Sequence, residues 1–69
     1  MKLSKYVVII KFTNDKSIIH NTNKKKDVDE WLDLSKDNEK FAEIQIFEHN
    51  KGTPSYTQTY IESKRKVGF

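Results

Sequence analysis

The chain contains no cysteine, which excludes disulfide bridges and zinc sites built from thiolates. It has only two glycines, which are too few for a glycine-rich loop that binds a phosphate. It has a single proline. At 69 residues it makes one small domain, which buries about 60% of its unfolded surface and is marginally stable alone. Because no disulfide can cross-link the chain, oligomerisation or partner binding is the remaining common source of added stability.

Long hydrophobic runs are also absent. The apolar run Tyr6–Ile10 is five residues long and is ended by Lys11. A membrane span needs about 20 apolar residues, and the apolar core of a signal peptide needs about 7–15. We therefore expect a cytoplasmic protein with no membrane partner.

Residue types that support catalysis are sparse. The two histidines, His20 and His49, fall in different predicted hairpins, so no acid–base pair is evident. Asp27, Asp29 and Asp33 are spaced along a predicted helix, not along a loop of the kind that binds calcium. We therefore expect a protein that is not an enzyme, with no catalytic residues, no metal and no cofactor.

Charge, by contrast, is plentiful and sorted by segment. Residues 1–26 carry seven lysines against one aspartate, a net charge of +6. Residues 27–48 carry eight acidic residues against two lysines, a net charge of −6, and residues 49–69 return to +3. An acidic middle between basic ends indicates a protein that meets charged partners.

The first part of the chain predicts a β-hairpin. The apolar, β-branched run Tyr6–Phe12 is typical of a central strand, and Ser17–Thr22 predicts a second strand. Between them, Asn14–Asp15 tolerates the left-handed backbone that a two-residue hairpin loop requires. Such a loop would pair Ile10 with Ile19.

A helix is predicted next. Asp27 suits the N-cap position, and Glu30, three residues later, completes the pattern of a capping box. We expect the helix to end near Ser35 or to fray as far as Lys40. The spacing i, i+3, i+4 gives one apolar stripe, which consists of Val28, Trp31 and Leu32.

A second hairpin is predicted after the helix. The segment Phe41–Glu48 alternates between apolar and polar residues, which is typical of a half-buried strand. After a polar turn, Tyr56–Ser63 is rich in hydroxyl groups and favours an edge strand. A four-residue loop between these two strands would place Glu43 opposite Tyr60.

These elements predict an α+β fold with the order ββαββ. The sheet would have four antiparallel strands in the order 2-1-3-4, with the one helix packed on one face. We expect a single domain over residues 1–63 and a basic C-terminal tail over residues 64–69.

The second face of such a sheet has no helix to cover it. An exposed apolar patch on a small domain is typical of a protein interface, either with a second copy in a homodimer or with a different protein. The residues predicted to form this interface are Val7, Ile9, Ile18, Phe47, Tyr56 and Tyr60.

Binding of single-stranded nucleic acid is the alternative function. The aromatic residues Phe47, Tyr56 and Tyr60 would stack on bases, although the usual signature of aromatic-rich RNA-binding sheets is absent. The predicted phosphate contacts are Lys11, Lys24, Lys25, Lys26, Lys64, Arg65 and Lys66.

An acidic helix surface is a further candidate for binding. Asp29, Glu30 and Asp33 could present carboxylates to a basic partner, as a mimic of nucleic-acid phosphates would. Acidic residues near a helix N-terminus also complement the helix dipole, which explains them without any partner.

The function that these features favour is that of a small protein-binding module. Lys, Ile and Asn, whose codons are rich in A and T, make up 24 of the 69 residues. This composition indicates an AT-rich bacterium, or a virus or mobile element that lives in one. We therefore expect a modulator or inhibitor of a host macromolecular machine.

Overall fold

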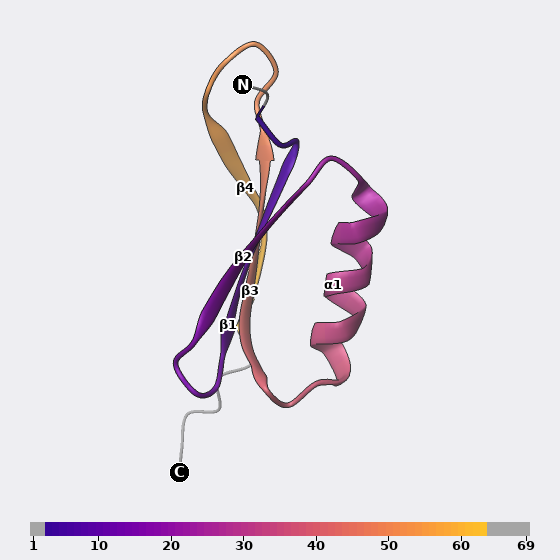
Figure 1. The fold of residues 1–69 in the computed structure, drawn as a ribbon, viewed down its shortest axis with the longest axis vertical. Coiled ribbons are helices and arrows are strands. Elements are labelled where there is room, and N and C mark those ends of the chain that lie inside the picture. Colours follow the sequence, from indigo (N-terminus) through magenta and orange to yellow (C-terminus); the bar gives the residue numbers. More distant parts are fainter. Residues whose placement is uncertain (1–2, 64–69) are drawn as a thin grey trace.

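The computed structural model describes residues 3–63, which form four strands and one helix in the order ββαββ (Figure 1). The predicted basic tail, residues 64–69, lies outside the described residues. The sheet order is β2-β1-β3-β4, and every neighbouring pair is antiparallel, so the predicted α+β fold is confirmed. The elements are β1 (Tyr6–Phe12), β2 (Ser17–Thr22), α1 (Lys25–Asp37), β3 (Phe41–His49) and β4 (Tyr56–Ser63).

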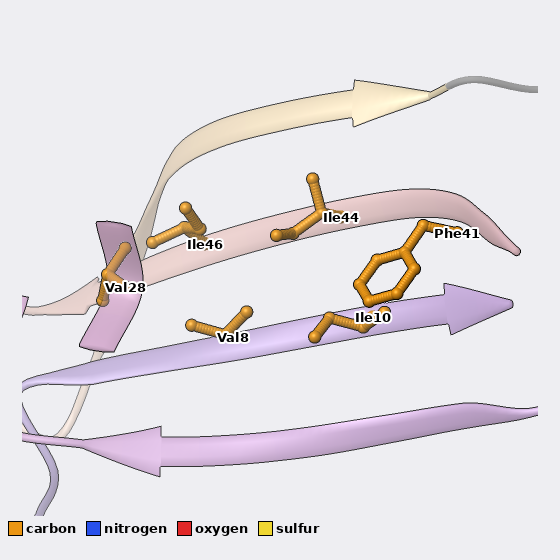
Figure 2. Packing of buried hydrophobic residues seen from close by; sticks show 6 residues of the cluster. All are labelled: Val8, Ile10, Val28, Phe41, Ile44 and Ile46. Atoms are coloured by element: carbon orange, nitrogen blue, oxygen red, sulfur yellow. The ribbon is translucent and has the colours of Figure 1, made fainter. Parts of the chain in front are cut away.

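The hydrophobic core lies between the two central strands and the helix. Figure 2 shows side chains from β1 and β3 on one side of the sheet, with Val28 of α1 over them. The helix lies over β2, β1 and β3 but not over β4. Trp31 and Leu32 pack partly buried against this core, as the apolar stripe predicts. Among residues 3–63, the buried hydrophobic residues are Val8, Ile10, Val28, Phe41, Ile44 and Ile46.

The first hairpin turns through three residues, so the predicted two-residue loop is wrong. Phe12 donates its N–H to the carbonyl of Lys16 at 2.8 Å, and Asp15 donates its N–H to the carbonyl of Phe12 at 3.1 Å. Asp15 has a φ of 69°, the left-handed residue that follows a type I turn in such loops. The extra residue moves the pairing by one, so Ile10 faces Ile18 and not Ile19.

The second hairpin also differs from its predicted register. Its turn lies one residue later than predicted, because Asn50 donates its N–H to the carbonyl of Ser55 at 2.9 Å and His49 pairs with Tyr56. A bulge in β4 at Thr59 then shifts the pairing, so that Ile46 faces Tyr60. Glu43 therefore lies opposite Ser63, and its predicted pairing with Tyr60 is wrong.

The helix begins at Lys25, two residues before the predicted N-cap. The N-cap position is held by Lys24 in an extended conformation, without a side-chain capping bond. The Thr22 hydroxyl, at the end of β2, accepts the N–H of Lys24 at 3.1 Å and donates to Asp27 Oδ2 at 2.7 Å, which ties the end of β2 to the first turn of the helix. The helix ends at Asp37, within the predicted interval.

Candidate protein interaction surface

The side of the sheet opposite α1, here called the open face, can be read row by row from the strand pairing. Side chains alternate between the two faces of each strand, so residues that are paired across strands share a face. The central row across β2, β1, β3 and β4 is Ile19, Ile9, Gln45 and Ile61. The rows on either side of it are Asn21, Val7, Phe47 and Gln58, and Ser17, Lys11, Glu43 and Ser63.

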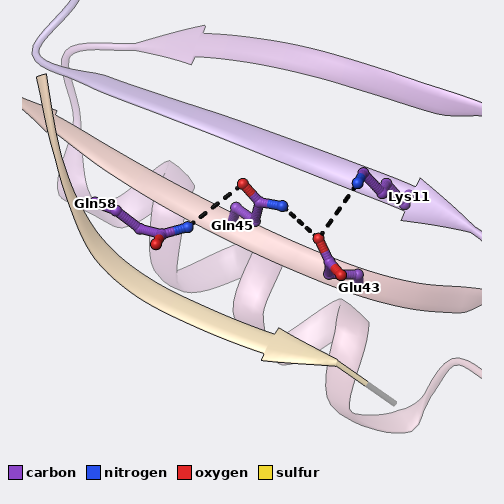
Figure 3. Close-up of polar contacts among 4 residues, drawn as sticks. All are labelled: Lys11, Glu43, Gln45 and Gln58. Carbon is purple, nitrogen blue, oxygen red and sulfur yellow. Dashed lines mark hydrogen bonds and ion pairs between the residues drawn. The ribbon is translucent and has the colours of Figure 1, made fainter. Parts of the chain in front are cut away.

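A connected set of polar side chains runs across the middle of the open face (Figure 3). Lys11 Nζ lies 3.6 Å from Glu43 Oε2, and the side-chain amide of Gln45 donates to the same carboxylate oxygen. Gln58 Nε2 donates to Gln45 Oε1 at 3.4 Å. These four residues, here called the polar ladder, link side chains of three strands across the open face.

Exposed isoleucines flank the polar ladder at both margins of the open face. Ile19 of β2 is 67% exposed and Ile61 of β4 is 54% exposed. Between them, Val7, Ile9 and Phe47 are half-buried. The open face therefore combines apolar area at its margins with oriented hydrogen-bonding groups at its centre, which is the mixture found in protein interfaces.

The strand pairing places four of the six predicted interface residues on the open face: Val7, Ile9, Phe47 and Tyr56. Ile18 was wrongly predicted there, because the three-residue loop turns it toward the helix, opposite Ile10. Tyr60 was also wrongly predicted there, because the bulge pairs it with Ile46 on the helix side. Whether these residues bind a partner stays a prediction.

Sequence reasoning missed the two most exposed isoleucines of the open face. The predicted two-residue loop pairs Ile19 with Ile10, which would place Ile19 on the core side of the sheet. The predicted pairing of Glu43 with Tyr60 would likewise turn the next residue, Ile61, to the core side, and the bulge at Thr59 reverses this. Asn14 and Asp15 were the available signal, since Asp15 also suits the left-handed position of a three-residue loop.

The three aromatic residues of the nucleic-acid alternative do not form one platform. The Tyr56 hydroxyl donates to the carbonyl of Ser4 at 2.7 Å, and its ring lies 5.3 Å from that of His49. Tyr60 lies on the opposite side of the sheet from Phe47. A hydrogen bond from the Tyr60 hydroxyl to Glu62, with smaller contributions from burial and the charge of Glu62, raises the pKa of Tyr60 above 10.0.

The predicted phosphate-binding residues are likewise divided among several places. Lys11 is on the open face in the polar ladder. Lys24, Lys25 and Lys26 are exposed where α1 begins, beyond the end of β2. Lys64, Arg65 and Lys66 lie outside the described residues.

The acidic helix surface is exposed. Asp29, Glu30 and Asp33 all face solvent, while Val28 and Ser35 of the same helix are buried against the sheet. Their binding role stays a prediction, since exposed carboxylates in a helix that packs by its other side are ordinary.

The two histidines lie in separate surroundings. The His20 ring packs 5.6 Å from the Trp31 ring between β2 and α1, and His49 Nε2 contacts the carbonyl of Thr53 in the second hairpin. A depression bounded by the first turn, the end of α1 and the start of β3 mixes lysines with acidic residues and contains neither histidine. Among residues 3–63, no group of three or more histidine and carboxylate side chains is placed to hold a metal ion.

The chain matches none of the family models, curated proteins or solved structures with which it was compared. Within the described part of the chain, no helix has the length and apolar character required to cross a bilayer.

Proposed function

We propose that this chain is a non-enzymatic protein-binding module whose binding surface is the open face. The observation that carries the proposal is the presence, on one side of the sheet, of exposed isoleucines around a fixed polar ladder. No other element of residues 3–63 covers this side. Burial of Ile19 and Ile61 against a partner would contribute favourably, at roughly 25 cal/mol per Å² of apolar surface removed from water.

The polar ladder would give such an interface its specificity. Lys11 and Glu43 already pair within the chain, so a partner need not neutralise an isolated charge. Gln45 and Gln58 retain further hydrogen-bonding capacity, because each amide can make more bonds than the ladder uses. A partner with matching donors and acceptors would be favoured, while one that buried these amides without bonding them would be rejected.

A modulator or inhibitor of a host macromolecular machine is the biological role that we propose for this binding. The small size supports it, since a 69-residue chain acts by occupying a surface of its partner. An origin in an AT-rich bacterium, virus or mobile element remains part of the same proposal, supported by composition alone.

The test compares two exposed residues that receive the same substitution. Ile61 on the open face and Leu34 on the outer side of α1 are both 54% exposed, so Ile61→Lys and Leu34→Lys carry similar costs for folding. Immobilised wild-type protein and both variants would be used to capture proteins from the lysate of the natural host. A captured protein would then be purified and its affinity for each form measured by calorimetry.

The proposal predicts that Ile61→Lys weakens binding at least tenfold, while Leu34→Lys binds as the wild type does. A partner that discriminates against Leu34→Lys alone would contradict it and move the binding surface to the helix. Capture of nucleic acid, with affinity that falls steeply as salt rises, would favour the alternative function instead.

A further inference from the structure

The two edges of the sheet differ in how well they are protected against pairing with another strand. Natural proteins protect edge strands with charged residues, proline or bulges. β4 carries two such devices, the bulge at Thr59 and the acidic residue Glu62. β2 has the sequence SIIHNT, with no charged residue and no proline, and its pairing with β1 is regular throughout.

Two backbone hydrogen bonds show which groups of β2 point outward. Phe12 and Lys16 form a hydrogen-bonded pair at 2.8 Å, and His49 donates to the carbonyl of Lys5 at 2.8 Å on the other side of β1. Bonded and non-bonded pairs alternate along antiparallel strands, so β1 bonds to β2 through its even-numbered residues. The backbone N–H and C=O groups that point away from β1 therefore belong to Ser17, Ile19 and Asn21.

We propose that β2 pairs antiparallel with β2 of a second copy of this chain, joining two four-stranded sheets into one. A two-fold axis would pass through Ile19, whose N–H and C=O groups would bond to those of Ile19 in the second copy. The same register pairs Ser17 with Asn21 on the open face and Ile18 with His20 on the helix side. Figure 2 shows β2 at the border of the sheet that residues 3–63 form.

Charge complementarity supports this register. Lys16, which precedes β2, is exposed and would lie opposite Thr22 of the second copy. Thr22 already holds the carboxylate of Asp27 at 2.7 Å. Directly paired Cβ atoms are about 4.5–5.5 Å apart, a distance from which a lysine ammonium reaches such a carboxylate. The two-fold axis would form this ion pair twice, once at each end of the interface.

Self-pairing would also bury apolar side chains of β2 that are exposed in the single chain. Ile19, at 67% exposed, and Ile18, at 39% exposed, lie on opposite faces of β2 and would both gain cross-strand neighbours. Because pairing uses the edge and not the face, both open faces would remain accessible on one side of the joined sheet. The inference therefore stands independently of the proposed function.

The first experiment is size-exclusion chromatography with multi-angle light scattering, on wild type and matched variants. We expect the wild type to elute as a dimer, at twice the 8.2 kDa chain mass, and Ile19→Lys to be a monomer. Ile61→Lys, the same change at the margin formed by β4, should remain a dimer. Circular dichroism would establish that each variant retains the fold.

Ile19→Pro tests the backbone component of the interface. Proline removes an N–H that points away from β1, so the bonds between β1 and β2 stay intact and an edge strand tolerates it. We expect a folded monomer. If Ile19→Pro does not fold, Ile19→Lys carries the same test through the side chain, by placing two lysines together on the axis.

The register is tested by oxidation, since the chain has no cysteine of its own. Ile19→Cys should form a disulfide-linked dimer readily, because directly paired residues fall within disulfide reach. Ile61→Cys should not do so under the same conditions. A wild type that stays monomeric at every concentration, or a dimer lost with Ile61→Lys but kept with Ile19→Lys, would overturn the proposal.

Discussion

Thr22 shows how one side chain can connect two elements. It is the last residue of β2, it is 8% exposed, and its hydroxyl bonds to both Lys24 and Asp27. The hydroxyl therefore ties the end of β2 to the first turn of α1, where the N-cap residue Lys24 makes no side-chain capping bond. Near the C-terminal end of the helix, Ser35 is buried. Its hydroxyl is not left without a hydrogen bond, because it donates to the carbonyl of Leu32 at 2.8 Å.

Tyr60 provides a prediction at the residue scale. Its hydrogen bond to Glu62 favours the neutral phenol, so its pKa in the folded state lies above 10.0. The resulting contribution to stability is fully present below the unfolded pKa, and it is lost as the pH rises through the folded pKa. Glu62→Ala should lower the titration midpoint of Tyr60.

The measurement is the ultraviolet absorbance of the phenolate, in a background where Tyr6→Phe and Tyr56→Phe leave Tyr60 as the single tyrosine. A midpoint that Glu62→Ala leaves unchanged would show that Glu62 does not hold the Tyr60 hydroxyl. The neighbouring change Ser63→Ala serves as the control, and it should not move the midpoint.

At the scale of the element, the first hairpin determines which side of β2 faces the helix. Its register depends on Asp15, whose backbone is left-handed with a φ of 69°. Among residues with a Cβ, asparagine and aspartate tolerate this conformation best, and β-branched residues tolerate it poorly. The three-residue loop therefore has a specific requirement at a single position.

Asp15→Gly and Asp15→Val should change the stability of the protein in opposite directions. Glycine adopts positive φ without steric cost, so we expect Asp15→Gly to be neutral or to stabilise by about 0.5 kcal/mol. Asp15→Val should destabilise by about 1–2 kcal/mol. Urea denaturation at one protein concentration measures both changes, and equal values for the two variants would contradict the loop geometry.

The sequence predicted which elements exist far better than how they pair. The β-branched run of β1 and the stripe of Val28, Trp31 and Leu32 are local patterns, and both elements formed as expected. The register of β2 was missed because Asn14 and Asp15 suit loops of two or three residues equally well. One residue of difference exchanged Ile18 and Ile19 between the two faces of the sheet.

Two further features depend on contacts that local patterns do not reveal. The bulge at Thr59 moved Tyr60 to the helix side, although threonine is an ordinary strand residue with no bulge signal of its own. The helix begins at Lys25, so Asp27 lies in its first turn and bonds to Thr22 of the preceding strand, although Asp27 offered the visible N-cap pattern. The sequence therefore predicted which side of the sheet is open, but not that Ile19 and Ile61 lie at its margins.

At the scale of the whole molecule, stability depends on a small core on one side of a single sheet. A 69-residue domain has a free energy of unfolding of roughly 3–10 kcal/mol. Within residues 3–63, six buried apolar residues form its centre, and the helix leaves the other side of the sheet uncovered. A mutation in so small a core therefore removes a large fraction of the free energy of unfolding. The open face and the edge of β2 contribute less to stability and remain available for binding.

Core and surface isoleucines should therefore respond very differently to truncation. Ile10 is fully buried, so Ile10→Ala should cost about 2–5 kcal/mol, a large fraction of the total stability. Ile61→Ala, on the exposed margin, should stay within about 0.5 kcal/mol of the wild type. Denaturant titrations at equal concentration would measure both values, and similar costs at the two positions would contradict the assignment of the core.

The central claim, that the open face binds another protein, is tested most directly by mapping amide chemical shifts while the partner is added to the labelled chain. We predict that the largest changes fall on the open face, at Ile9, Gln45 and Ile61, with little change at Asp29 and Asp33 on the outer side of α1. Changes centred on those two aspartates, with the open face unaffected, would contradict the claim.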